Sequence, residues 1–304
     1  MSECTAYLAP EGFLPELLRE LRDVQEVHGR LVICSGENQD VLWTENTWFD
    51  ARRIPVESIG KAAKSLRDMQ RNWANYAHEH HRRSSLIEAK LPHVSARPLT
   101  FGDSMPTAPL GSWTLLNKDT LFAASRCSSA FPNGQAAFHE DKAVPPTRAY
   151  LKLWEALTLL PKRPAPGQLC LDLGSCPGGW TWVLQSLGAR VISVDKAPLE
   201  RGIDCLPGVK FLQQSAFALE PCEVGLVDWI FCDIACYPSR LLSMVKRWLE
   251  AEMCANFVCT IKLQGEVDPI EMAEFRELAN PGIRHLWHNK HELTWIKLDC
   301  PIRN

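Results

Sequence analysis

Glycines and a carboxylate follow two apolar segments of the chain at a spacing that suits nucleotide binding. Residues 171–180 read LDLGSCPGGW, so Gly174, Gly178 and Gly179 come directly after an apolar run. Glycines there let the backbone turn sharply and approach a ligand, and the N–H groups that open a following helix are available to bind it. About twenty residues further on, a second apolar run ends at Asp195, whose carboxylate is placed to accept both hydroxyls of a ribose. The spacing predicts a nucleotide site at the ends of two strands.

This loop differs from the one that binds dinucleotides. A dinucleotide loop reads GxGxxG, whereas residues 174–179 read GSCPGG. The middle glycine that admits a pyrophosphate is missing, and Pro177 stiffens the loop. A dinucleotide ligand is therefore disfavoured.

The elements that must position this loop alternate from Thr147 onward. Thr147 is a candidate N-cap for a helix through RAYLKLWEALTLL, which Pro161 ends. Strands are expected at QLCLDLG, ARVISVD, VKFLQQ, LVDWIFCDIA and NFVCTIKL, helices at GGWTWVLQSLG, SRLLSMVKRWLEAEM and DPIEMAEFRELAN, and a closing pair of strands at HLWH and LTWIKL. Strands alternating with helices predict an α/β fold with a parallel, doubly wound sheet, which binds ligands at the carboxyl ends of its strands.

The first half of the chain has a different character. Residues 1–60 carry five basic and eleven acidic side chains, and residues 61–100 reverse this balance. Lys61, Lys64, Arg67 and Arg71 recur at helical spacing, which predicts a basic helix face that is solvated unless it meets a nucleic acid. Residues 98–147 are rich in Pro, Gly and Ser, with short apolar strand candidates at TLLN and TLFAAS. We expect a smaller α+β domain over residues 1–100, an irregular connector over residues 101–146 and the α/β domain over residues 147–304.

Composition excludes several classes of protein. The 304 residues are 46% hydrophobic with a net charge of −3, which is typical of a globular protein without a global attraction to nucleic acid. No apolar run approaches the roughly 20 residues that cross a bilayer, and the opening residues do not resemble a signal peptide. The 12 cysteines are scattered without a CxxC pair, as in reduced cytoplasmic proteins, and the histidines at 78, 80 and 81 lack partners at metal-ligand spacing. We expect a cytoplasmic protein with no membrane partner and no bound metal.

The loop sequence DLGSCPGGW resembles motif I of the S-adenosylmethionine-dependent methyltransferases. Its PGGW form is similar to that of the FtsJ-like RNA ribose 2′-O-methyltransferases. The resemblance implies a Rossmann-like, seven-stranded domain that binds S-adenosyl-L-methionine. The residues that it places at the cofactor are Asp172, Gly174, Ser175, Cys176, Pro177, Gly178, Gly179, Trp180, Asp195, Ser215 and Asp233. Family members often carry an acidic residue near the adenine where this chain has Ser215, which puts cofactor affinity in question.

The same resemblance implies a catalytic set of two lysines and two carboxylates. The family's Lys–Asp–Lys–Glu tetrad is matched in chain order and context by Lys152, Asp233, Lys262 and Glu292. The reaction is an in-line displacement at the methyl carbon of a sulfonium, so the attacking ribose hydroxyl must lose its proton. A free lysine, with a pKa of about 10.4, is a poor base at neutral pH, but a second lysine and burial both lower that pKa.

These considerations assign a role to each of the four. We expect Lys262, with a lowered pKa, to be the general base and Lys152 to position the hydroxyl or the developing alkoxide. Asp233 is expected to orient Lys262, and Glu292 to hold the lysine pair and the ribose.

Segments outside the loop narrow the resemblance within the family. The opening YLAPEGFLPELLREL, the PTRAYLKLWEA and SVDKAPL segments and the HELTW ending are similar to those members that methylate a cytidine ribose in 23S rRNA. Those members carry a THUMP-type RNA-binding region before the catalytic domain. The resemblance therefore implies a large-subunit rRNA substrate and a diverged, THUMP-like RNA-binding domain over residues 1–100. The sequence indicates no particular oligomeric state.

Other functions stay open as alternatives. Enzymes that methylate exocyclic amines typically place Asn/Asp-Pro-Pro-aromatic after the fourth strand, where this chain reads Asp233-Ile234-Ala235-Cys236. Oxygen is therefore favoured over nitrogen as the acceptor, and metal-dependent small-molecule O-methylation would need clustered carboxylates. The remaining alternatives are a non-catalytic RNA-binding protein that kept a methyltransferase fold, a haemolysin-like relative, and a 2′-O-methyltransferase of a different RNA.

Overall fold

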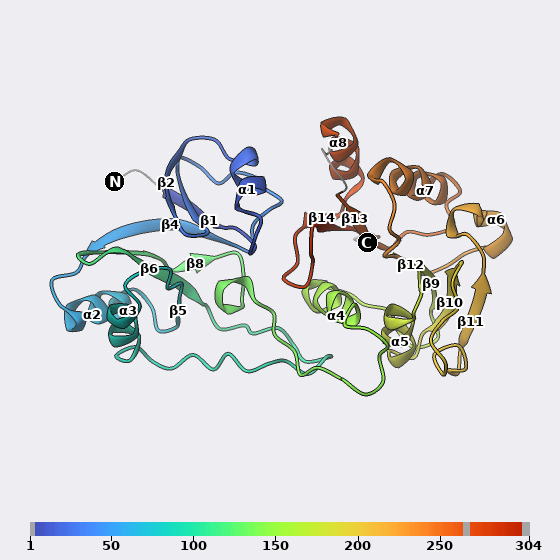
Figure 1. The fold of residues 1–304 in the computed structure, drawn as a ribbon, viewed down its shortest axis with the longest axis horizontal. Coiled ribbons are helices and arrows are strands. Elements are labelled where there is room, and N and C mark those ends of the chain that lie inside the picture. Colours follow the sequence, from blue (N-terminus) through green and yellow to red (C-terminus); the bar gives the residue numbers. More distant parts are fainter. Residues whose placement is uncertain (1–3, 264–267, 300–304) are drawn as a thin grey trace, which may run out of the picture. The chain divides into compact units, whose positions relative to one another are not determined.

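The computed structural model describes residues 4–263 and 268–299 and divides the chain into two compact units, residues 1–139 and 140–304 (Figure 1). This division corrects the expected connector over residues 101–146. Residues 111–127 form three strands of the first unit, and residues up to 139 belong to it. The Pro- and Gly-rich composition that predicted a connector belongs to the loops on either side of these strands.

The first unit is an α+β structure built on an antiparallel sheet. Its elements in chain order are β1 Cys4–Leu8, α1 Leu14–Glu20, β2 Val24–His28, β3 Leu31–Ser35, β4 Asn46–Pro55, α2 Ile59–Met69, β5 Trp73–Asn75, α3 His81–Glu88, β6 Gly111–Asn117, β7 Thr120–Ala124, β8 Arg126–Cys127 and the short 3₁₀ helix η1 Pro132–Gly134. Within the described residues the strand order is β2-β3-β1-β4-β7-β6-β5, with β8 paired to β4. Only the β5–β6 pair is parallel in this part of the chain.

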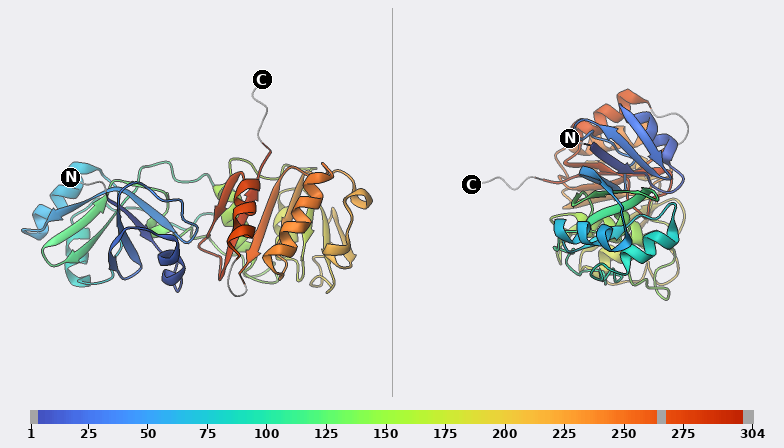
Figure 2. Two further views of the ribbon diagram at one scale, coloured as in Figure 1. Left: turned by 90° about the horizontal axis from the view of Figure 1, so that it is seen from above. Right: turned by 90° about the vertical axis from the view of Figure 1, so that its left-hand side faces the viewer.

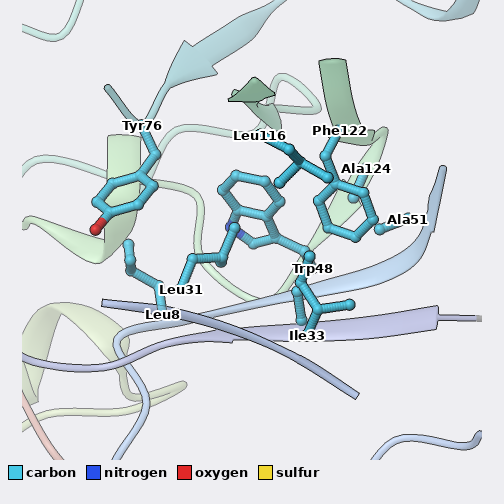
Figure 3. Close-up of a cluster of buried hydrophobic side chains, with 10 residues drawn as sticks. Leu8, Leu31, Ile33, Trp48, Ala51, Tyr76, Leu116, Phe122 and Ala124 are labelled. Carbon is cyan, nitrogen blue, oxygen red and sulfur yellow. The ribbon is translucent and has the colours of Figure 1, made fainter. Parts of the chain in front are cut away.

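Side-chain alternation along β6 and β7 divides the core of the first unit into two clusters. Phe122 points to one face and Leu121 to the other, as successive strand residues must. The face with Leu121 packs against α2 and α3, whose buried residues include Leu66 and Ile87. The other face forms the Trp48 cluster, in which the Trp48 ring is fully buried (Figure 3). The Trp48 cluster consists of Ala6, Leu8, Leu31, Ile33, Trp48, Ala51, Tyr76, Leu116, Phe122 and Ala124.

The second unit is a doubly wound α/β structure, as the sequence predicted. Its elements are α4 Tyr150–Leu159, β9 Leu169–Leu173, α5 Gly179–Ser186, β10 Arg190–Asp195, β11 Val209–Gln213, η2 Ala216–Ala218, α6 Pro221–Val224, β12 Trp229–Cys232, α7 Pro238–Glu250, β13 Phe257–Lys262, α8 Pro269–Leu278, β14 Pro281–Arg284 and β15 Glu292–Lys297. The described residues form one seven-stranded sheet in the order β11-β10-β9-β12-β13-β15-β14. Figure 1 shows α4 and α5 on one face of the sheet and α7 and α8 on the other, and Figure 2 shows α7 beside α8.

Two local predictions for this unit are wrong. The helix after Thr147 begins at Tyr150, and Thr147 Oγ1 accepts only a long hydrogen bond of 3.4 Å from Ala149 N. The segment HLWH was expected as a strand, but it lies in the loop between β14 and β15. The strand that precedes it and pairs with β15 is β14, which ends at Arg284, just before HLWH. No helix among residues 4–263 and 268–299 is long and apolar enough to cross a membrane.

Candidate active site at the carboxyl edge of the second sheet

Four elements bring the two lysines and two carboxylates to one edge of the sheet. β9, β12 and β13 are parallel, so their carboxyl ends meet there: Asp233 directly follows β12, and Lys262 is the last residue of β13. β15 runs antiparallel to β13, which places Glu292, its first residue, opposite Lys262 in the register. Lys152 lies in the first turn of α4, the helix that leads down to β9. The fold therefore assembles residues separated by up to 140 positions in the sequence.

The four side chains form a closed ring of alternating charge, called the charged ring below. Lys152 Nζ donates to both oxygens of Asp233 at 3.1 Å, and Lys262 Nζ donates to Asp233 Oδ1 at 2.6 Å. Lys262 also donates to Glu292 Oε2 at 2.5 Å, and Lys152 closes the ring through an ion pair with Glu292 Oε1. Each ammonium thus contacts both carboxylates. These charge-assisted contacts, in which each ammonium bridges two carboxylates, fix the positions of all four groups.

The members of the charged ring differ in how deeply they are buried. The side chains of Lys152 and Glu292 are 7% and 8% exposed, whereas Lys262 is 20% exposed. The Lys152 ammonium also lies 5.9 Å from the ring centroid of Trp180, within reach of a cation–π interaction. Lys262 is therefore the more accessible ammonium for an incoming hydroxyl, which suits the predicted division between a positioning lysine and a reacting lysine.

The charges around the ring correct the expected pKa of Lys262. Burial lowers the pKa of its ammonium, but Asp233 and Glu292 together outweigh burial and raise the pKa above its usual value. Burial raises the pKa of Asp233, but Lys152 and Lys262 outweigh burial and lower it below its usual value. The expected lowering of this pKa took account of the second lysine and of burial, but not of the opposite effect of Asp233 and Glu292 on the same ammonium. In this arrangement Lys262 holds its proton at neutral pH.

The glycine loop, residues 174–179, joins β9 to α5 at the same edge and approaches Ile234 and Ile203 closely. Gly174 has φ +77°, and a Cβ there would lie 2.5 Å from Ile234 Cγ1 and 3.0 Å from the backbone of Ile234. Gly178 has φ +116°, and a Cβ there would lie 2.7 Å from Ile203. Both positions combine a left-handed backbone with a close approach, so only glycine fits without strain. Ile234 directly follows Asp233, which ties the loop to the charged ring.

Polar groups of this loop suit a nucleoside ligand. Asp195 Oδ2 accepts a hydrogen bond from Cys176 N at 3.0 Å and Oδ1 accepts from Ala197 N at 3.0 Å, while the carboxylate retains further lone pairs. Ser175 is 4% exposed, and its hydroxyl has no hydrogen-bond partner among the described residues. A buried hydroxyl without a partner is costly, and a bound ligand would satisfy it. The cradle therefore fits the nucleoside cofactor that the sequence implied.

The other residues expected at the cofactor lie at the loop or beneath it. Asp172 is 1% exposed and accepts a 2.6 Å hydrogen bond from Thr181 Oγ1, and burial raises its pKa to about 7. Trp180 is buried and donates from Nε1 to Ala149 O at 3.0 Å, joining α5 to α4. These two hydrogen bonds link β9 to α5 and α5 to the start of α4, and so support the loop between β9 and α5.

Ser215 and the remaining loop residues lie at the same edge. Ser215 is half-buried just before η2, two residues beyond the end of β11. Pro177 O accepts from Glu200 N at 2.8 Å, and Gly179 opens α5. No described contact joins Ser215 to the glycine loop.

Glu155 is a residue that the sequence reasoning missed. It lies one helical turn after Lys152 and is 3% exposed. Its Oε1 accepts from Trp287 N at 2.8 Å, and its Oε2 accepts from His288 N at 2.9 Å and contacts His288 Nδ1 at 2.7 Å. Glu155 thus fixes the loop that leads into Glu292. A glutamate three residues after Lys152, on the same helix face, was the only sequence signal for it.

The fold and site together define a class. A seven-stranded sheet with one antiparallel strand near its edge, a glycine loop after its first strand and an acid after its second is the Rossmann-like methyltransferase fold. Residues 146–273, which make up most of the second unit, match the model of the FtsJ-like methyltransferase family.

Curated relatives extend this match beyond the family model. The ribosomal RNA large subunit methyltransferase M of Halorhodospira halophila is 34% identical over 168 residues, which cover 52% of this chain and 49% of that protein. The protein of the same name from Cellvibrio japonicus is 33% identical over 184 residues, 55% of this chain and 52% of that protein. This chain therefore spans about half the length of the curated relatives it matches. Among solved structures, TrmN from Thermus thermophilus covers 97% of this chain and 100% of its own, with a TM-score of 0.36 at 13% identity. This TM-score and this identity are too low to bear on function.

Proposed function

We propose that the protein is an S-adenosylmethionine-dependent RNA methyltransferase that transfers a methyl group to a ribose 2′-hydroxyl of large-subunit (23S) rRNA, at a cytidine. The observation that carries this proposal is the charged ring of Lys152, Asp233, Lys262 and Glu292 beside the glycine loop. Burying four charges costs free energy that an apolar core would avoid, so such a ring indicates a chemical role. The match to the FtsJ-like family supports the same reaction class.

The glycine loop and Asp195 are proposed to hold the cofactor. Asp195 would accept the ribose hydroxyls of the cofactor, the Ser175 hydroxyl and the loop N–H groups would bind its amino-acid part, and Ser215 with the backbone of Ala216 and Phe217 would meet the adenine. S-adenosylmethionine supplies an activated methyl group on a sulfonium. The loop's proximity to Asp233, through Ile234, would bring that methyl group to the charged ring.

The charged ring is proposed to deprotonate and aim the ribose hydroxyl. Lys262, once neutral, accepts the hydroxyl proton while the oxygen attacks the methyl carbon in line and the carbon–sulfur bond breaks. Lys152 stabilises the developing negative charge on the oxygen, Asp233 orients both lysines, and Glu292 holds the pair and the ribose. Fixing the nucleophile in line supplies much of the acceleration. Because Lys262 is protonated at rest, the active fraction of enzyme increases with pH.

The first unit is proposed to bind RNA as a diverged THUMP-like domain. The basic residues on α2 and its end, Lys61, Lys64, Arg67 and Arg71, are all exposed, as phosphate-contacting residues must be. Lys61 pairs with Glu57 and Arg67 donates to Lys90 O, while Lys64 and Arg71 complete the face. The names of the curated relatives point to large-subunit rRNA as the partner.

The cysteines support a cytoplasmic location. Six cysteines in the described part of the chain are buried free thiols: Cys34, Cys170, Cys232, Cys236, Cys254 and Cys259. Unpaired core thiols are typical of a reducing compartment.

The test is methyl transfer from isotopically labelled S-adenosylmethionine to unmodified 23S rRNA, followed by digestion to nucleosides. The proposal expects label in one 2′-O-methylated nucleoside, 2′-O-methylcytidine. Label in a different RNA only would replace the substrate, and label on a base would overturn the role of the charged ring. Cofactor binding without any transfer to RNA would favour a non-catalytic RNA-binding protein.

A further inference from the structure

Two aromatic side chains are exposed beside the charged ring. Among the Phe, Tyr and Trp residues of the described chain, only Tyr237 and Trp287 are exposed, at 63% and 37%. Tyr237 lies four residues after Asp233, and Trp287 lies five residues before Glu292. Tryptophan and tyrosine rings bury large areas when they pack, so leaving Tyr237 largely and Trp287 partly in solvent forgoes stability. Exposed aromatic residues on connections that reach one edge of a sheet suit a surface that a ligand covers.

The topology places both rings at the edge that carries the charged ring. Tyr237 precedes α7 in the connection that leaves the carboxyl end of β12, immediately after Asp233. Trp287 lies in the connection from β14 to β15, and the pairing of Lys262 with Glu292 puts that connection at the carboxyl end of β13. The two aromatic residues therefore belong to the two connections that supply the carboxylates of the charged ring.

Both rings are carried by fixed backbone. Glu155 accepts hydrogen bonds from the N–H groups of Trp287 and His288, and the Trp287 ring makes an edge contact with His288 at 4.7 Å. Tyr237 is the N-cap residue of α7, with Pro238 at the first helical position. A ring on fixed backbone loses little conformational entropy when a ligand covers it.

Basic side chains accompany each aromatic residue. Lys290 is exposed three residues after Trp287, and Arg240 is exposed three residues after Tyr237, with its guanidinium 3.9 Å from the Phe217 ring centroid. Aromatic rings interleaved with basic groups are the features that bind single-stranded nucleic acid, the rings by stacking on bases and the cations by contacting phosphates.

We propose that Tyr237 and Trp287 stack on unpaired RNA bases next to the ribose held at the charged ring, with Arg240 and Lys290 contacting the adjoining phosphates. This inference rests on the proposed function and adds its substrate class, an RNA segment whose bases are unstacked around the methylated nucleotide. Inside an A-form helix the bases stack on one another and offer no face to an aromatic side chain. Single-stranded or looped RNA is therefore the substrate, and a continuous duplex is not.

The test measures binding of the full-length protein to a fluorescently labelled, single-stranded oligoribonucleotide of mixed sequence and to the same sequence as a duplex. Trp287→Ala and Tyr237→Ala are each expected to weaken single-strand binding about 5- to 100-fold, in line with one lost base stack. Trp287→Phe and Tyr237→Phe keep a ring and should stay close to wild type. Leu226→Ala is the matched control, since Leu226 is 75% exposed but precedes β12 at the opposite edge of the sheet.

Salt dependence separates stacking from charge. The two alanine variants should keep the wild-type slope of log Kd against log salt, whereas Lys290→Gln should reduce it by about 0.7, the value for one phosphate contact on a single strand. Unchanged affinity in both alanine variants, or preference of the wild type for the duplex, would overturn the inference.

Methyl transfer distinguishes failure of this inference from failure of the proposed function. If wild type methylates rRNA and both alanine variants match its kcat/KM for the RNA, stacking is wrong and the function stands. If wild type binds single strands in a Trp287-dependent way but transfers no methyl group, stacking stands and the function is wrong.

Discussion

The Trp48 cluster of the first unit and the charged ring of the second unit are both assembled from segments far apart in the sequence. Apolar packing holds the Trp48 cluster together, whereas ion pairs hold the charged ring together. The Trp48 ring is 0% exposed and packs against Phe122 at a centroid distance of 6.2 Å, among apolar side chains (Figure 3). The charged ring joins two lysines and two carboxylates that are each at least partly removed from water. Apolar burial stabilises a fold outright, whereas buried ion pairs roughly offset their own desolvation.

The two regions are therefore expected to have different roles. The Trp48 cluster is expected to determine the stability of the first unit and to leave the chemistry untouched. The charged ring is expected to determine the chemistry and to add little to stability. Stability is therefore tested at the Trp48 cluster, and activity or cofactor binding at the charged ring and the residues around it.

Truncating the centre of the Trp48 cluster should have the largest effect. Trp48→Ala is expected to lower the free energy of unfolding of the first unit by about 3–5 kcal/mol, because it removes a fully buried aromatic ring and leaves a cavity. Denaturant unfolding measures this loss, with Leu226→Ala as an exposed control. A loss below about 1 kcal/mol would show that the cluster is not the core that its burial indicates.

Removing the charge of Glu155 should impair turnover without touching the charged ring directly. Glu155→Gln replaces one of two acceptor oxygens by an NH2 group, which then faces a backbone N–H of the loop that leads into Glu292. Displacing Glu292 by a fraction of an ångström is expected to lower kcat about 10- to 100-fold, with cofactor affinity unchanged. Steady-state kinetics beside Glu250→Gln, an exposed glutamate of α7, checks this. Equal losses of kcat and cofactor affinity would make Glu155 a general structural residue.

The pH dependence should report the raised pKa of Lys262. A base whose pKa lies above its usual value is mostly protonated at neutral pH, so kcat/KM for the RNA is expected to rise about tenfold per pH unit between about pH 6.5 and 8.5. Initial rates across this range measure the slope. A plateau within the range would mean that a group other than Lys262 limits the reaction in the free enzyme.

Asp195→Ala should produce the smallest of these effects. The change removes the proposed acceptor of the cofactor ribose, and loss of one charge-assisted hydrogen bond is expected to raise the cofactor Kd about tenfold. Calorimetric titration with S-adenosylmethionine measures this, with Glu277→Ala on α8 as an exposed control. An unchanged Kd would remove Asp195 from the cofactor site.

Much of the second unit could be predicted because its strands are continuous apolar runs that end at polar residues. The strand ending before Asp233 and the one ending at Lys262 were both located from sequence, and the parallel order then brought their ends together. Local patterns predict where an element lies, and the doubly wound topology predicts which ends meet.

The misses share a physical cause, which is that they depend on contacts distant in the sequence. HLWH has an apolar centre typical of a strand, but Glu155, 132 positions from Trp287, fixes its backbone as a loop. TLLN and TLFAAS were expected as strands inside a connector, but TLFAAS pairs with β4 and with TLLN, which makes both strands part of the first unit's sheet. The sign of the Lys262 pKa shift depended on how near the two carboxylates lie, which spacing in the sequence does not show.

Lys262→Ala tests the central claim most directly. Single-turnover methyl transfer to 23S rRNA is measured for wild type and variant, together with the Kd values for S-adenosylmethionine and for the RNA. If Lys262 is the general base, the rate is expected to fall about 10²- to 10⁴-fold, with both Kd values and the unfolding midpoint close to wild type. A variant that transfers methyl groups at the wild-type rate, or that loses binding and stability as much as activity, would contradict it.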